Sequence, residues 1–153
     1  SASGSWSFEA YFKAPRAGAF DYFGASVAIS AATVVIGAHE EDSCSTTTTT
    51  SVASVPSGNG CGKAGAAYVY SRGASGWLFK AHVKSPNADK LHHELHHDAR
   101  LGTDGSFDRF GTAVAADGDV IAVGAPFDDS GVDHLKVGAV YVQDAHNGPH
   151  SSA

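Results

Sequence analysis

The sequence predicts an all-β protein made of two copies of one antiparallel unit. The segment 20–38 returns in similar form as 107–125, and repetition at so long a period indicates supersecondary units that bury their apolar faces against one another. Of the 153 residues, 42% are hydrophobic and only 17% charged, and 18 are glycine, which favours short strands and turns over charged helices. We therefore expect two four-stranded antiparallel sheets.

Two blocks of the sequence begin with tryptophan, and each block is expected to form the outermost strand of one unit. In both blocks apolar residues occupy every second position, the pattern of a half-buried strand. The residues expected to share one face are Trp6, Phe8, Ala10 and Phe12 in the first block and Trp77, Phe79, Ala81 and Val83 in the second. The first block thus duplicates the second.

Three further blocks recur in the same order along the chain. We expect strands around Phe23-Gly24 and Phe110-Gly111, around Val34 and Val120, and around Ala66 and Ala139. The runs beginning at Val34 and Val120 are continuously apolar, which predicts strands covered on both faces. Residues inserted between the blocks belong in loops.

The combination of these blocks resembles the FG-GAP repeat of integrin α-subunits and of many secreted microbial proteins. Phe23-Gly24 is followed by Gly37-Ala38, then by a Gly-Ala-x-Tyr-Val strand and a tryptophan strand, and most of the order recurs from Phe110. The resemblance implies four-stranded blades of the β-propeller type, an extracellular location, adhesion or surface roles and, in some members, calcium.

The order of the blocks predicts an unusual domain organisation. We assign residues 1–15 to a spare strand, 16–86 to a first blade, 87–106 to a histidine-rich insertion, and 107–153 to a second, incomplete blade and tail. No tryptophan strand follows the second blade, so its fourth strand is missing. Propellers usually have four to eight blades, so two blades are not expected to close a ring. We expect the N-terminal strand of a neighbouring molecule to complete the second blade.

This organisation predicts a secreted structural subunit that assembles head-to-tail with copies of itself. The alternatives are a monomeric or dimeric adhesion or carbohydrate-binding module, whose strand folds back or is exchanged reciprocally, and a fragment of a longer propeller. The net charge of −6 provides no basic stripe for nucleic acid, and no apolar run approaches the roughly 20 residues that span a bilayer. The chain has no Met and begins at Ser1, which we interpret as removal of a secretion signal.

A polar segment between two cysteines carries two expected modifications. Cys44 and Cys61 flank the segment closely and are expected to form a disulfide in an oxidising compartment, with a pair of free thiols as the alternative. Runs of Ser and Thr near Pro are typical of O-glycosylated stretches in secreted chains, and an undecorated flexible loop is the alternative. The expected glycan sites are Thr46, Thr47, Thr48, Thr49 and Thr50.

Two groups of residues have the composition of metal sites. His93 and His97 belong to an H-E-x-x-H string, but the string lies in an insertion without further recognisable machinery, so we expect no protease. We expect a solvated histidine-rich loop, with a transition-metal site on His93 and His97 as the alternative. Asp128 and Asp129 could contribute to a calcium site, yet calcium takes six to eight oxygen ligands and the loop offers few. We expect no cofactor, and the absence of any nucleophile signature predicts that the protein is not an enzyme.

Overall fold

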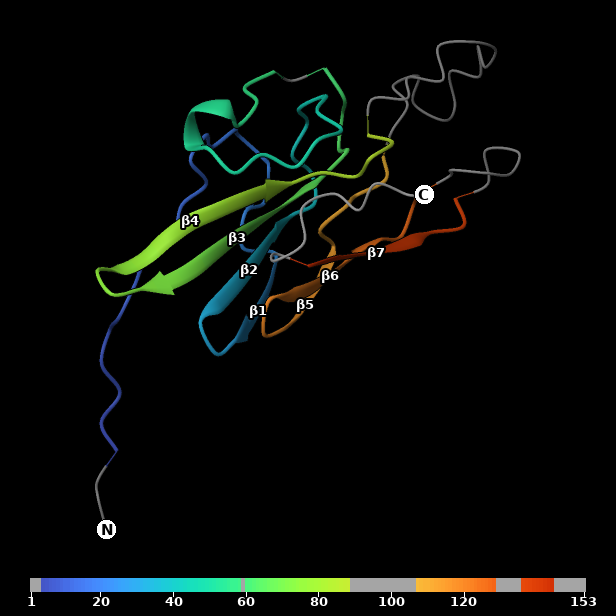
Figure 1. Ribbon diagram of the computed structural model, residues 1–153. Coiled ribbons are helices and arrows are strands. Elements are labelled where there is room, and N and C mark those ends of the chain that lie inside the picture. The colour runs from blue at the N-terminus through green and yellow to red at the C-terminus, as the bar shows by residue number, and fades with distance from the viewer. Residues whose placement is uncertain (1–3, 59, 89–106, 129–135, 145–153) are drawn as a thin grey trace, which may run out of the picture.

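The computed structural model describes residues 4–58, 60–88, 107–128 and 136–144, and in these ranges the regular secondary structure is almost entirely β-strand. The elements are the strands β1 (Ser26–Ser30) and β2 (Thr33–Ala38), a short 3-10 helix (Val52–Ser54), and the strands β3 (Ala66–Gly73), β4 (Gly76–Val83), β5 (Ala113–Asp117), β6 (Val120–Ala125) and β7 (Ala139–Asp144) (Figure 1). The predicted all-β class is confirmed.

The strands form two antiparallel sheets that repeat one topology. The first sheet, here the first blade, has the order β1-β2-β3-β4, and the second sheet, the second blade, has the order β5-β6-β7. Within a single chain the second blade therefore has three strands in the described residues, because the N-terminal segment does not join it. The fourth strand of this blade, which is expected from a neighbouring molecule, is not among the described strands of the single chain.

The Phe-Gly pairs lie in turns that precede β1 and β5, not within strands as the sequence suggested. Gly24 and Gly111 have φ angles of 96° and 91°, in the left-handed region that favours glycine. The Gly24 amide donates to the Gly37 carbonyl and the Gly111 amide to the Gly124 carbonyl, both at 3.0 Å. The two turns are thus built alike.

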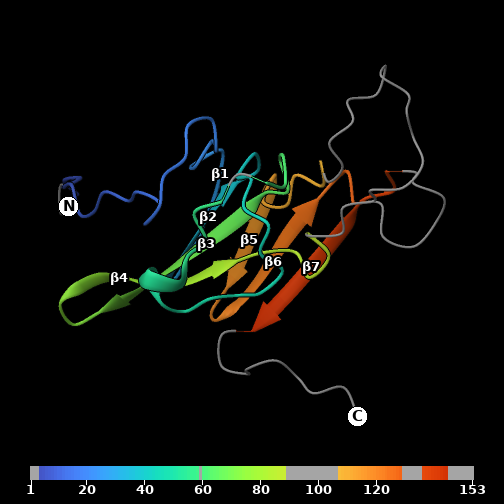
Figure 2. The same ribbon diagram turned by 90° about the horizontal axis from the view of Figure 1, so that it is seen from above.

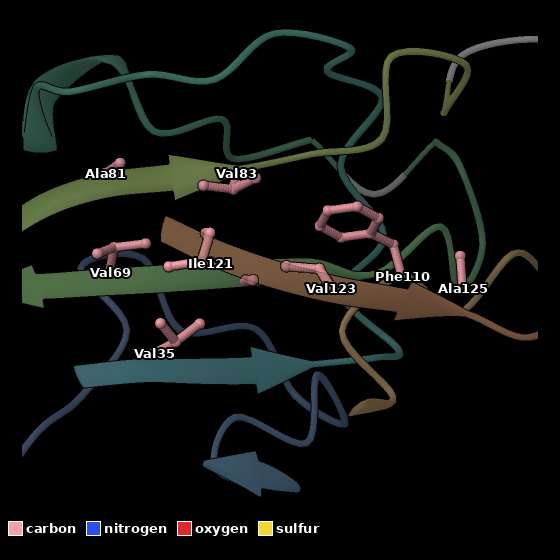
Figure 3. Close-up of a cluster of buried hydrophobic side chains, with 9 residues drawn as sticks. Val35, Val69, Ala81, Val83, Phe110, Ile121, Val123 and Ala125 are labelled. Atoms are coloured by element: carbon pink, nitrogen blue, oxygen red, sulfur yellow. The ribbon is translucent and has the colours of Figure 1, made fainter. Parts of the chain in front are cut away.

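The inner face of the first blade packs against one face of the second blade, and this contact contains the main core. Val35, Val69 and Val83 of the first blade meet Ile121 and Val123 of the second (Figure 3). Phe110 is fully buried between the blades, where its ring lies 5.4 Å from that of Tyr141. The phenylalanine of the Phe-Gly turn therefore fills the junction.

Backbone contacts fix how the turn meets the first blade. The Phe110 amide donates to the Ala64 carbonyl at 3.1 Å, Gly65 and Phe110 form an isolated parallel bridge, and the Ser26 hydroxyl donates to the Gly111 carbonyl at 2.7 Å. A Cβ atom at Gly37 would lie 2.1 Å from the Gly111 carbonyl oxygen. Glycine is needed at position 37 because the next blade's backbone approaches so closely.

The two outer faces differ. A second cluster covers the outer face of the first blade, where Ala14, Phe12 and Phe23 pack on Val34, Ile36, Tyr68 and Tyr70. β2 is accordingly buried along its whole length, as predicted for the run from Val34. The same prediction is wrong for the run from Val120, whose burial alternates, because no described segment covers the outer face of β6.

A β-bulge corrects the predicted face of the tryptophan strand. Phe79 pairs with Tyr70 but Ala81 pairs with Val69, so Lys80 is an extra residue in β4. Because one inserted residue shifts the alternation, Trp77 and Phe79 lie on the outer face, whereas Ala81 and Val83 lie on the inner one.

We expect Gly37→Ala to destabilise the fold by about 1–3 kcal/mol, because its methyl group overlaps the Gly111 carbonyl and the Ser26 hydroxyl. The matched control is Gly124→Ala, at the equivalent position of the second blade, where the added atom meets only Ala113 at 3.6 Å. Urea unfolding of dilute protein measures both variants. Equal free energies of unfolding for the two would contradict the assigned role of Gly37.

Candidate functional site

The open edge of the second blade is the main feature of the candidate site. β7 pairs with β6 from Ala139 to Asp144, and within the described ranges no strand lies along its other edge (Figure 2). Val140 and Val142 on this strand are 70% and 67% exposed. An edge strand with unpaired backbone groups and apolar side chains is a template for pairing with another strand.

The corresponding edge in the first blade is filled. β3 is the counterpart of β7, and β4 lies beside it from Ala67↔Val83 to Gly73↔Gly76. The outer edge of β4 is in turn covered at one point, since Thr49 and His82 exchange backbone hydrogen bonds of 2.9 and 2.8 Å. The second blade thus lacks the strand that the first blade obtains from its own chain.

The N-terminal segment, whose residues were expected to form a donor strand, is not a strand in the single chain. Residues 4–13 have no regular secondary structure, Trp6 is fully exposed and Phe8 is 84% exposed. A strand requires a neighbouring strand that pairs with its backbone groups, and this segment pairs with none of the described strands. Figure 1 shows it as an extended trace that leaves the body of the molecule.

The C-terminal half of this segment is held against the first blade. The Phe12 and Tyr70 rings lie 4.8 Å apart, and the Tyr70 hydroxyl donates to the Lys13 carbonyl at 2.8 Å. Glu9 accepts a hydrogen bond from the Trp77 indole and forms an ion pair of 2.7 Å with Arg72. The segment is therefore anchored at residues 9–14, while its first aromatic residues remain in water.

A buried ion pair lies at the C-terminal end of β4, the fourth strand of the first blade. The Lys84 ammonium lies 2.6 Å from the Glu41 carboxylate, and both residues are buried. Burial lowers the pKa of Lys84, while Glu41 opposes that shift, and burial raises the pKa of the nearby Asp21. His82 lies next to Lys84 in the chain, and burial lowers its pKa to about 3, so its ring is neutral at neutral pH.

The second blade carries an acid at the equivalent place. Asp128, the counterpart of Glu41, is buried and accepts hydrogen bonds from the Tyr141 hydroxyl and, at 3.2 Å, from the Asn87 amide. Asp128 is therefore not an exposed turn acid, the other meaning that its place in the sequence suggested beside a contribution to a calcium site. Sequence analysis also missed the ion pair, although its signal was present: Lys13 follows Trp6 at the same distance as Lys84 follows Trp77.

The remaining predicted site residues are placed as follows. A disulfide joins Cys44 to Cys61. In the threonine run, Thr47, Thr48 and Thr50 are exposed, whereas the Thr49 hydroxyl oxygen is buried. His93, His97 and Asp129 lie outside the described residues. Among the residues described, no group of three or more His, Cys, Asp or Glu side chains is arranged to hold a metal ion.

Comparison with protein families gives one match. The sequence model of the FG-GAP repeat matches residues 6–70 and again residues 103–143, which together make up most of the chain. The first match begins at Trp6 and ends in β3, and the second covers β5 to β7. No curated protein sequence matches the chain. In the described residues no helix is long and apolar enough to cross a membrane.

We expect Lys84→Met to lower the free energy of unfolding by about 3–5 kcal/mol, because it leaves the Glu41 carboxylate buried without its cation. The double variant Lys84→Met with Glu41→Gln removes both charges and should recover part of this loss. Chemical denaturation of dilute protein provides the comparison. A single variant as stable as the unmodified chain would show that the pair does not hold this end of the blade.

Proposed function

The chain belongs to the FG-GAP repeat family, and from this premise we propose that it is a secreted structural subunit whose N-terminal strand completes the second blade of the next molecule. Head-to-tail repetition of this contact gives an extracellular filament or surface layer. The observation that carries the proposal is that one chain has both an open β7 edge and a spare copy of the strand that fills this edge in the first blade.

The repeat predicts how the donated strand lies on β7. Trp6 takes the place of Trp77, Glu9 that of the bulged Lys80, and Phe12 that of Val83. The strand gains main-chain hydrogen bonds along the edge, and its exposed aromatic side chains gain about 1.5–3 kcal/mol each on full burial. Donation therefore covers the open β7 edge of one molecule and the exposed aromatic side chains of the next.

Charge complementarity supports the same register. Lys84 reaches the buried Glu41 in the first blade, and Lys13 is its counterpart in the spare strand. In the proposed assembly Lys13 lies beside Asp128 of the neighbouring molecule, which takes the place of Glu41. A slip of one residue would turn Lys13 to the opposite face, so the charge pair selects one register.

Two other observations support an extracellular location. A disulfide is typical of oxidising, extracellular compartments, and the FG-GAP family is typical of extracellular proteins. Donor and acceptor are different surfaces of one molecule, so the contact is heterologous and propagates unless its rotation closes a ring. The partner in this proposal is the protein itself, and no catalytic step, nucleic acid or membrane insertion is part of it.

Deleting residues 1–14 is expected to abolish assembly, because the strand that fills the β7 edge is lost. Negative-stain microscopy and sedimentation of the full and truncated chains measure this effect. A synthetic peptide of residues 1–14 should bind the truncated protein and, added to the full chain, stop growth by capping the open edge. The matched control peptide carries Lys13→Glu and should bind at least about tenfold more weakly, a difference of about 1.4 kcal/mol.

Two results would contradict strand donation. One is a truncated chain that assembles as the intact chain does. The other is an intact chain that remains monomeric at all concentrations, which would leave the alternatives of an adhesion module or a piece of a larger propeller. Far-UV circular dichroism of the truncated chain separates lost assembly from lost folding.

The proposal includes O-linked sugars on the exposed threonines of the segment between the cysteines. Glycans on Thr47, Thr48 and Thr50 would hydrate this loop. Native material is expected to exceed the 15.6 kDa sequence mass by whole sugar units. An intact mass equal to that of the bare chain would exclude the modification.

A further inference from the structure

We propose that the outer face of the second blade is a socket for the Phe23-Gly24 turn of the next molecule, which makes the contact between molecules a copy of the contact between blades. This inference rests on the proposed head-to-tail assembly and adds a second, independent surface to it. The occupant is a second copy of this chain. Four features of the molecule lead to it.

The first feature is a complete example of the contact inside one chain. Gly37 and Gly65, the first glycine socket, receive the Phe110-Gly111 turn so closely that a Cβ on either would lie 2.1 Å from a backbone oxygen of that turn. The Arg109 and Phe110 amides donate to the carbonyls of Lys63 and Ala64, both at 3.1 Å. The socket is therefore built from small residues and exposed backbone acceptors.

The second feature is an open copy of this socket on the second blade. Gly124 and Gly138 are the counterparts of Gly37 and Gly65, and they line a hollow of about 530 Å³ together with Ala113, Val137 and Val140. A Cβ at Gly124 would meet only Ala113, at ordinary contact distance, among the described residues. The chain's own packing does not require glycine at position 124, whereas a docked turn does.

The third feature is the match of the proposed ligand to the internal one. The Phe23-Gly24 and Phe110-Gly111 turns have the same glycine conformation and the same hydrogen bond to a β-strand carbonyl. The Phe23 ring lies edge-on to the Tyr68 ring at 5.2 Å, and the Phe110 ring lies tilted against the ring of the counterpart Tyr141 at 5.4 Å. The Phe23 turn therefore presents the backbone that the second socket would bind.

The fourth feature is a set of exposed aromatic residues at matching positions. In the internal junction the Lys63 ammonium lies 5.9 Å from the centre of the Phe107 ring. The repeat counterparts are Lys136 beside the second socket and Phe20 beside the Phe23 turn. In the single chain the Lys136 ammonium already lies 5.3 Å from the centre of the Phe107 ring and 5.2 Å from that of the Phe127 ring, whereas Phe20 is exposed. A cation–π contact between Lys136 and Phe20 of the next molecule would cover this ring.

Chain connectivity allows the same neighbour to make both contacts. β4 completes the first blade, and the chain then returns to place Phe110 on that same blade. The spare strand is likewise followed by the Phe23 turn, and the ten Cα-to-Cα steps from Lys13 to Phe23 reach about 33 Å when extended. One neighbouring molecule can thus fill the β7 edge and the second socket together.

The test uses the full-length chain with Gly124→Ala. The added methyl group fits the isolated molecule but would overlap the docked turn, so we expect assembly to need a protein concentration at least about tenfold higher, measured by sedimentation and negative-stain microscopy. The control is Gly58→Ala, where a Cβ meets nothing within 4 Å, and this variant should assemble like the unmodified chain. Phe20→Ala tests the other side of the contact and should weaken assembly in the same direction.

A second readout distinguishes the socket from strand donation. A fluorescent peptide of residues 1–14 contains the spare strand but not the Phe23 turn, so it should bind the β7 edge of the Gly124→Ala chain as tightly as that of dilute unmodified chain. Assembly of Gly124→Ala at the unmodified concentration, with peptide binding retained, overturns the socket and leaves donation in place. Failure of the peptide to bind either chain overturns donation, and the effect of Gly124→Ala on assembly then still reports on the socket. An unmodified chain that never assembles overturns both.

Discussion

The close approach of one blade's Phe-Gly turn to the glycines of the preceding blade is the constraint on which this structure depends. It allows two sheets to pack face to face with Phe110 fully buried between them. The turn needs a left-handed glycine at Gly111, and the receiving strand needs Gly37 because no side chain fits beneath the turn's carbonyl. The two dipeptides that identify the repeat, Phe-Gly and Gly-Ala, are thus the two halves of one contact.

This constraint also explains why the molecule is incomplete at both ends. A blade has two apolar faces and two edges of backbone groups. A neighbouring blade on one side covers only one of the two faces. The first blade covers its outer face with Phe12, Ala14 and Phe23, whereas Val140 and Val142 of the second blade face solvent. Apolar surface and unpaired backbone exposed together are unfavourable, and both are removed when the same kind of unit is added again.

The sequence predicted the repeated strands well because alternation and repetition are local signals. It could not predict the bulge at Lys80, since the spacing of Trp77, Phe79, Ala81 and Val83 is that of an uninterrupted strand and the extra residue appears only in the pairing with β3. Nor could it distinguish β2 from β6: both are apolar runs, and only the tertiary arrangement leaves one face of β6 uncovered. The Lys84–Glu41 pair joins two loops far apart in sequence, so it was visible only as an unexplained repeated lysine.

The rotation between molecules decides whether repeated contacts give a ring or a filament. If that rotation equalled the rotation between the two blades, two-bladed subunits would close into a propeller with an even number of blades.

The junction between the blades and the proposed junction between molecules are not chemically equal, however. Inside the chain Arg109 lies 3.5 Å from Glu40, whereas their counterparts at the proposed contact are Tyr22 and Phe127, both exposed aromatic residues. The connection from strand to turn also differs, with nine residues between Lys13 and Phe23 and 25 between Lys84 and Phe110. In the proposed assembly different side chains and a shorter connection set the rotation between molecules, so nothing constrains this rotation to equal the internal one. The proposed filament and a closed ring would therefore use the same kind of contact and differ only in that rotation.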